Sequence, residues 1–155
     1  MEGTGITERL TAEALEQHQQ IHFYLDQITA TLDGLDPHAD DVAPLLERLT
    51  AQIDGFMERL REHHQLEEKR GLFRMILEIL PEARVEISRL VKQHQRIIEI
   101  LEMARLHAQN GTSQDAVGLK EDLASFVQMF RNHERSEELL LRQALSRETD
   151  GGGLR

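Results

Sequence analysis

Six residues of this sequence have the types and spacing of ligands for a metal centre. They are His18, His63, Glu67, His94, His133 and Glu137. Each glutamate follows a histidine by four residues, and residues four apart in an α-helix lie on the same face. A helix that carries such a pair offers one imidazole nitrogen and one carboxylate oxygen to the same side. Two such helices, with one histidine from each of two others, would surround a dinuclear metal centre.

The six residues interrupt stretches in which apolar side chains recur in steps of three and four. This spacing marks the buried face of a bundle helix, and it occurs over residues 14–32, 46–67, 83–104 and 119–144. A buried carboxylate or imidazolium without a partner costs several kcal/mol, so six such groups need a shared compensation. Ordinary hydrogen bonds would satisfy a single core histidine, but six polar residues on four buried faces favour a metal centre.

Turn-forming residues separate these stretches into four predicted helices. The first helix is predicted to stop near Gly34, and the second to open near Asp40 with Pro44 in its first turn. We expect the second helix to continue through residues 72–80 as far as Pro81, which suits the first turn of the third helix better than a helix interior.

Turn-forming residues also separate the predicted helices in the second half of the chain. The third helix is predicted to end around residues 110–111, and the fourth to follow an N-cap at Thr112 or Ser113. The expected domain spans residues 1–148, and residues 149–155 are predicted to form a disordered tail.

The second and fourth helices repeat one pattern. Residues 56–68 read FMERLREHHQLEE and residues 126–138 read FVQMFRNHERSEE, an offset of 70. Gln-His-Gln at 17–19 recurs at 93–95, an offset of 76. Short loops between long helices place successive helices antiparallel. The predicted fold is all-α: an up-down-up-down antiparallel four-helix bundle with an internal pseudo-twofold repeat of a helical hairpin.

Composition excludes several classes of function. The chain has 155 residues, a net charge of -10 and no cysteine. Without cysteine there is no thiolate nucleophile, zinc finger or cysteine-held iron–sulfur cluster. The negative charge disfavours nucleic acid and anionic membrane surfaces as partners. The start of the sequence does not resemble a signal peptide, and no apolar run approaches a membrane span, so we expect a cytoplasmic protein.

The order of one His, then His-x-x-x-Glu, then one His, then His-x-x-x-Glu resembles the hemerythrin-like family, also called the HHE cation-binding domain. The resemblance covers residues from about Leu10 to Leu145. It implies a non-haem centre of two iron ions, bridged by the two glutamates and by an oxo or hydroxo group. It also implies that the six residues named above are the ligands.

His22 is a candidate seventh ligand. Oxygen-carrying hemerythrins have a fifth histidine one turn after the histidine of the third helix, where this chain has Ile98 after His94. The pseudo-equivalent position on the first helix is His22, four residues after His18. His22 is therefore predicted either to bind the metal or to lie beside the centre.

A site of imidazole and carboxylate groups without sulfur suits iron or manganese, and the resemblance favours iron. The sequence predicts a protein that binds O2, or a related small oxidant such as nitric oxide or peroxide, as a carrier, sensor or scavenger. One alternative is a di-iron enzyme or repair factor that turns over peroxide or nitric oxide, or that supplies iron for cluster repair. Another alternative is a bundle whose metal is purely structural.

Overall fold

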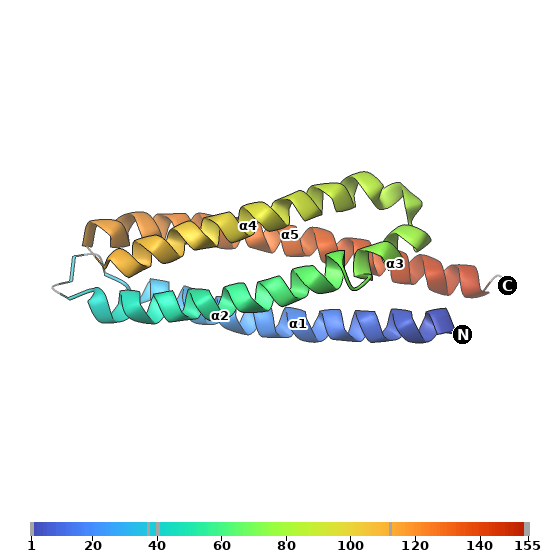
Figure 1. Cartoon of the computed structure of the whole chain (residues 1–155), viewed down its shortest axis with the longest axis horizontal. Coiled ribbons are helices and arrows are strands. Elements are labelled where there is room, and N and C mark those ends of the chain that lie inside the picture. The colour runs from blue at the N-terminus through green and yellow to red at the C-terminus, as the bar shows by residue number, and fades with distance from the viewer. Residues whose placement is uncertain (1, 37, 40, 112, 154–155) are drawn as a thin grey trace.

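The computed structural model describes residues 2–36, 38–39, 41–111 and 113–153, and it is all-α over these residues (Figure 1). Its elements are α1 (Glu2–Asp33), α2 (Ala43–Glu68), α3 (Leu72–Ile79), the 3-10 turn η1 (Pro81–Ala83), α4 (Arg84–Asn110) and α5 (Ser113–Gly153). The four long helices run alternately in opposite directions, which confirms the predicted up-down-up-down bundle. Within the described residues, none of these helices combines the length and apolar character that crossing a membrane requires.

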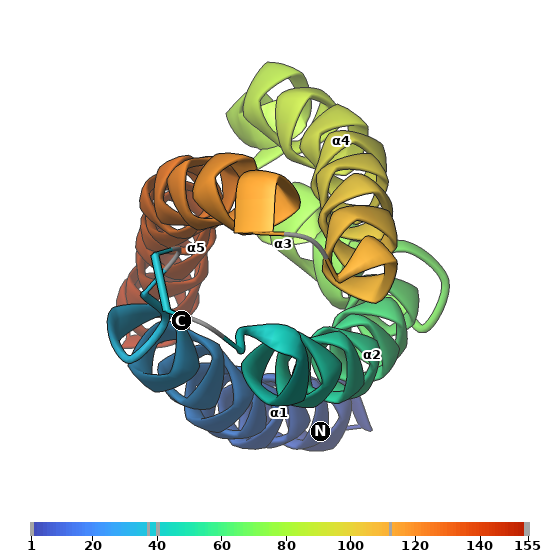
Figure 2. The same ribbon diagram turned by 90° about the vertical axis from the view of Figure 1, so that its left-hand side faces the viewer.

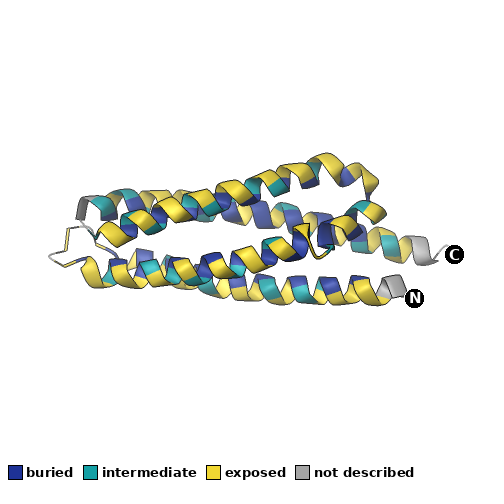
Figure 3. Ribbon diagram, viewed as in Figure 1, coloured by how far each residue is buried: buried dark blue, intermediate teal, exposed yellow. Residues whose placement is uncertain are grey.

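The four long helices form a ring when the molecule is viewed along its axis (Figure 2). Helix α1 packs against α2, α2 against α4, α4 against α5, and α5 closes the ring against α1. Each helix turns its buried residues toward the centre of this ring and its exposed residues outward (Figure 3). The apolar periodicity of the sequence therefore places the six predicted ligands inside the bundle.

The interior contains two apolar clusters. The larger cluster includes Leu25, Leu49 and Phe56, and it fills the end of the bundle where α1 joins α2. The smaller cluster includes Leu66 and Leu90, and it fills the other end together with α3. Burial of each large apolar side chain contributes about 1.5–3 kcal/mol relative to exposure, so these clusters hold the four helices in register around the polar layer between them.

The segment after α2 differs from the sequence prediction. We expected helix two to continue through residues 72–80, but α2 ends at Glu68 and a separate helix, α3, begins at Leu72. Gly71 between them has a φ of +107°, a left-handed conformation that costs a residue with a Cβ about 1–2 kcal/mol. The break turns α3 so that its apolar side chains, among them Phe73 and Ile76, cover the smaller cluster.

The other helix ends follow the prediction more closely. Helix α1 ends at Asp33, before Gly34, and α2 carries Pro44 in its first turn. Pro81 opens the turn η1 that leads into α4, and α4 ends before Gly111, whose φ is +70°. Two predicted boundary residues, Asp40 and Thr112, lie outside the described residues.

Helix α5 extends into the segment for which the sequence predicted a disordered tail. Helix α5 continues through Gly153, and residues 154–155 lie outside the described part of the chain. Extending an existing helix adds one backbone hydrogen bond for each residue fixed, so a helix can continue beyond its last packed turn.

Candidate metal centre

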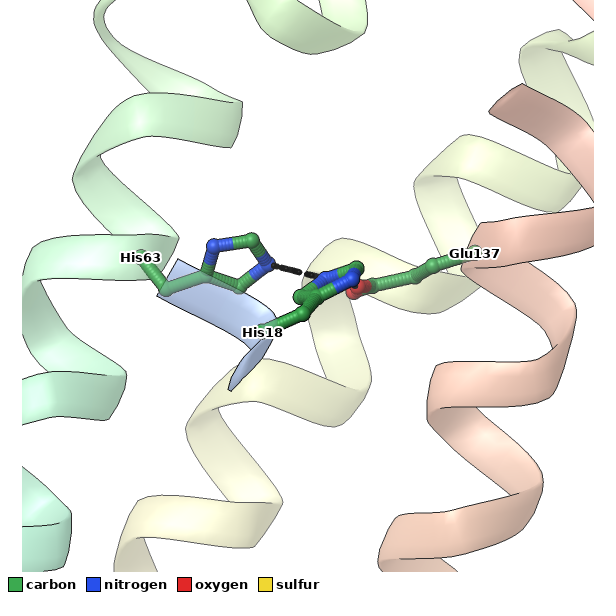
Figure 4. Close-up of side chains that lie close together, drawn as sticks. All are labelled: His18, His63 and Glu137. Atoms are coloured by element: carbon green, nitrogen blue, oxygen red, sulfur yellow. Dashed lines mark hydrogen bonds and ion pairs between the residues drawn. The ribbon is translucent and has the colours of Figure 1, made fainter. Parts of the chain in front are cut away.

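His18 from α1, His63 from α2 and Glu137 from α5 converge inside the bundle (Figure 4). The Nε2 atoms of the two histidines are 3.0 Å apart. Oε2 of Glu137 lies 3.8 Å from Nε2 of His18 and 3.6 Å from Nε2 of His63. The three side chains are buried, and their ligand atoms lie within 4.8 Å of one another, which is close enough to share one metal ion.

A second group of three shares Glu137 with the first. Its other members are His94 from α4 and His133 from α5. Oε1 of Glu137 lies 3.2 Å from Nε2 of His94 and 2.6 Å from Nε2 of His133. Because Oε2 faces one histidine pair and Oε1 faces the other, this carboxylate spans the two groups.

Glu67 from α2 also lies between the two histidine pairs. Its Oε2 is 3.4 Å from Nε2 of His63, and its Oε1 is 3.2 Å from Nε2 of His94. Glu67 is 1% exposed, so its charge is held away from water. Two carboxylates that each face both histidine pairs have the arrangement of bridging ligands for two ions.

Apolar side chains enclose this polar layer. Ile21, Leu60, Ile97 and Phe130 come from all four long helices, and each is at most 2% exposed. His18, His63 and Glu137 share with three of them a cavity of about 10 Å³, close to the minimum for one water molecule. In such dry surroundings an electrostatic interaction is stronger than it is in water.

The charges of the site shift several pKa values strongly. Burial alone would lower the pKa of His63 and His94, but Glu67 and Glu137 outweigh it and raise both to about 10. Burial would raise the pKa of Glu137, but hydrogen bonds from the surrounding histidines hold it well below its usual range. Bound protons therefore compensate the carboxylates when no metal ion is bound, as a cation would.

The donor set fits a metal better than it fits hydrogen bonding. Oε1 of Glu67 and Nε2 of His133 are buried and have no hydrogen-bond partner among the described residues, although both lie close to other site atoms. Buried polar atoms rarely stay unpaired in this way. Once the imidazoles have lost the proton on Nε2, the atoms that approach one another are all lone-pair donors, which a metal ion satisfies together.

Three acceptors fix the orientation of the site histidines. Nδ1 of His63 donates to Oε1 of Gln17 at 2.8 Å, and Nδ1 of His133 donates to Oε1 of Gln93 at 2.6 Å. Nδ1 of His94 donates to a carboxylate oxygen of Glu68 at 2.8 Å. Because these oxygens only accept, each Nδ1 carries the proton and each Nε2 is left to bind a metal. The sequence analysis missed this role, although the repeated Gln-His-Gln motif was its signal.

Replacing Gln17 should therefore weaken metal binding without removing a ligand. We expect Gln17→Leu to lower metal affinity about 10- to 100-fold, the usual effect of losing such a partner. The measurement is metal affinity by competition with a chelator. Gln19→Leu is the matched control, because Gln19 lies on the other side of His18 and is exposed. Equal affinities in both variants would contradict the orienting role of Gln17.

His22 and Glu134 both lie outside the two groups of ligand atoms. The side chain of His22 is 48% exposed, and its Nε2 lies 2.9 Å from Oε2 of Glu134. Glu134, on α5, was not selected by the sequence analysis, yet it is 4% exposed and lines the same cavity as His18 and His63. Its only sequence signal was its position next to His133.

Comparison with known proteins agrees with this geometry. The hemerythrin HHE cation binding domain matches residues 7–145. No curated protein and no solved structure matches the chain. The match covers most of the chain, including every helix that contributes to the polar layer. The chain therefore belongs to the hemerythrin HHE cation-binding family, whose domains bind metal ions, typically iron.

Proposed function

We propose that this protein is a non-haem di-iron protein that binds O2, or a related small oxidant such as nitric oxide or peroxide, as a carrier, sensor or scavenger. The observation that carries the proposal is the pair of carboxylates that each face both histidine pairs. Oε1 and Oε2 of Glu137 lie near different pairs, and the same is true of Glu67. This arrangement supports two metal ions rather than one.

The proposed ligands are the six residues of the polar layer. His18 and His63 would hold one ion, His94 and His133 the other, and the two glutamates would bridge them. Nitrogen and oxygen donors without sulfur suit iron, in line with the family to which the chain belongs. An oxo or hydroxo bridge would complete the proposed cofactor. When bound, the iron supplies the electrons and the open coordination position that binding a small oxidant needs.

The protein's own residues set the conditions for that binding. Two octahedral ions offer about twelve coordination positions. The four histidines would take four of them, the two bridging carboxylates four and the bridging oxygen two, so about two would stay open. Ile21, Leu60, Ile97 and Phe130 exclude bulk water from these positions. Gln17, Gln93 and Glu68 keep three of the imidazoles oriented. Small apolar molecules can enter such a site, whereas bulky or charged ones are excluded.

Iron analysis and an absorption spectrum test the proposal. The purified protein, reconstituted with iron and reduced under nitrogen, is expected to change its spectrum on exposure to air and to recover it on removal of O2. Repeated turnover of peroxide without a stable oxygenated spectrum would favour the enzyme alternative. A bound metal whose spectrum responds neither to reductant nor to air would contradict the proposal and favour a structural site.

A further inference from the structure

The internal repeat of the sequence is broken beside the polar layer. At the offset of 70 that superposes His63 on His133, Glu134 takes the place of His64. At the offset of 76 that superposes His18 on His94, His22 takes the place of Ile98. One side of the bundle therefore has a histidine and an isoleucine next to the ligand histidines, and the other side has a glutamate and a histidine.

The structure shows where His64 and Ile98 lie. The ring of His64 stacks on the ring of His94, with centroids 3.8 Å apart and an angle of 8° between the planes. His64 and Ile98 line the same groove on that side of the bundle. His64 also lines the central cavity, but its stacking on His94 accounts for its position without a ligand role.

Packing does not account for Glu134 in the same way. Its side chain is 6% exposed, and it lines the central cavity with His18, His63 and Glu137. Neither of its carboxylate oxygens has a hydrogen-bond partner among the described residues. Nε2 of His22 approaches to 2.9 Å, but the contact does not have hydrogen-bond geometry. A buried carboxylate that accepts no hydrogen bond, and whose one ion-pair contact is a half-exposed histidine, is costly unless a further cation compensates it.

The cavity itself indicates where the cation would lie. Glu134 shares this cavity with His18 and His63, whose Nε2 atoms are 3.0 Å apart. A metal ion held by these two histidines would supply positive charge at the cavity that Glu134 lines.

We propose that Glu134, rather than His22, is the additional ligand of the centre: a third carboxylate that binds the ion held by His18 and His63. This inference rests on the proposed function, because it requires the dinuclear centre described above. His22, which is half exposed, then contacts the outer side of that carboxylate and does not bind metal itself.

A third carboxylate would make the two metal positions unequal. The ion near Glu134 would have one fewer open position than the ion near His94, so a small ligand would bind to the latter. An added negative charge also favours the more highly charged oxidation state of the ion beside it. The ion held by His94 and His133 would thus provide the open position.

Titration of the metal-free protein with Fe(II) under nitrogen, in competition with a chelator, tests the assignment. We expect the parent to bind two ions and Glu134→Gln to lose at least about 10-fold in affinity for one of them. Glutamine keeps the shape of the side chain, so the melting temperature of the metal-free variant should equal or exceed that of the parent. If Glu134 had a purely structural role, Glu134→Gln would lower the melting temperature of the metal-free protein and leave both metal affinities unchanged.

Two further variants complete the test. Glu138→Gln removes the neighbouring carboxylate, which does not line the cavity, and it should bind both ions as the parent does. Glu134→Asp keeps the charge but withdraws it by one methylene, so it should also lose affinity for one ion. The assignment is overturned if Glu134→Gln binds both ions with the parent's affinities, or if only His22→Ala loses affinity. If the parent protein does not bind two ions, that result contradicts the proposed function itself rather than the role of Glu134.

Discussion

Glu137→Ala is expected to lose both metal ions, the largest effect of any single substitution in the site. Among the described residues, Glu137 is shared by the two groups of ligand atoms, and its two oxygens face different histidine pairs. Its removal takes one ligand from each ion and leaves the surrounding imidazoles without their common carboxylate. The measurement is metal content per chain after reconstitution with excess iron and desalting, where the parent should retain about two ions.

Three other variants test the remaining ligands by the same measurement of metal content. His63→Ala and His133→Ala each remove a nitrogen ligand from one ion, and Glu67→Ala removes the other bridging carboxylate, so metal content should fall sharply in all three. Glu138→Ala is the control, because it removes an acidic residue beside Glu137 that belongs to neither group. Retention of two ions in Glu137→Ala would contradict the assignment of this site.

Removal of the metal should lower the melting temperature, and by more at pH 9 than at pH 6. A ligand present at about 1,000 times its dissociation constant stabilises a folded protein by about 4 kcal/mol. For a domain of this size, about 1 kcal/mol corresponds to about 2–4 °C, so each bound ion should raise the melting temperature by on the order of 10 °C. The measurement is thermal unfolding by circular dichroism, with and without metal, across this pH range.

The pH dependence follows from the protons that compensate the carboxylates in the metal-free protein. His63 and His94 have folded pKa values of about 10, above the ordinary histidine value of about 6.5. Their stabilising contribution is therefore complete below about pH 6.5 and is lost as the pH rises through 10. The raised pKa of Glu134, about 8, acts in the same direction, because its folded state gives up a proton only at high pH.

The metal-bound protein should not show this loss, because the ions take the place of those protons. A metal-dependent gain in melting temperature that stays constant from pH 6 to pH 9 would contradict the explanation. An unchanged melting curve after verified metal removal would instead favour hydrogen-bonded core histidines. His38→Ala serves as the control, because His38 is exposed in the loop between α1 and α2 and its loss should leave the pH dependence intact.

The amino-acid sequence was enough to predict which polar residues lie inside the bundle. Steps of three and four residues define one face of a helix, and the strength of the pattern left no doubt which face is buried. The positions of His63 and Glu67 follow from this register alone, because four residues return to the same face of α2 whatever surrounds it. The internal repeat then gave the corresponding pair on α5. The bundle and the convergence of six polar groups were predictable for this reason.

Positions beside the buried faces were decided by the tertiary structure. Glu134 lies one residue after His133, about 100° further around α5, and His22 lies beside the buried face of α1. A modest rotation of either helix would exchange the residue that enters the cavity for the one that faces solvent. The packing of α1 against α2, and of α5 against α4 and α3, fixes these rotations, so that Glu134 is buried and His22 is half exposed. Helical periodicity fixes what lies at the centre of a face, whereas helix packing alone decides which residue at its edge reaches the site.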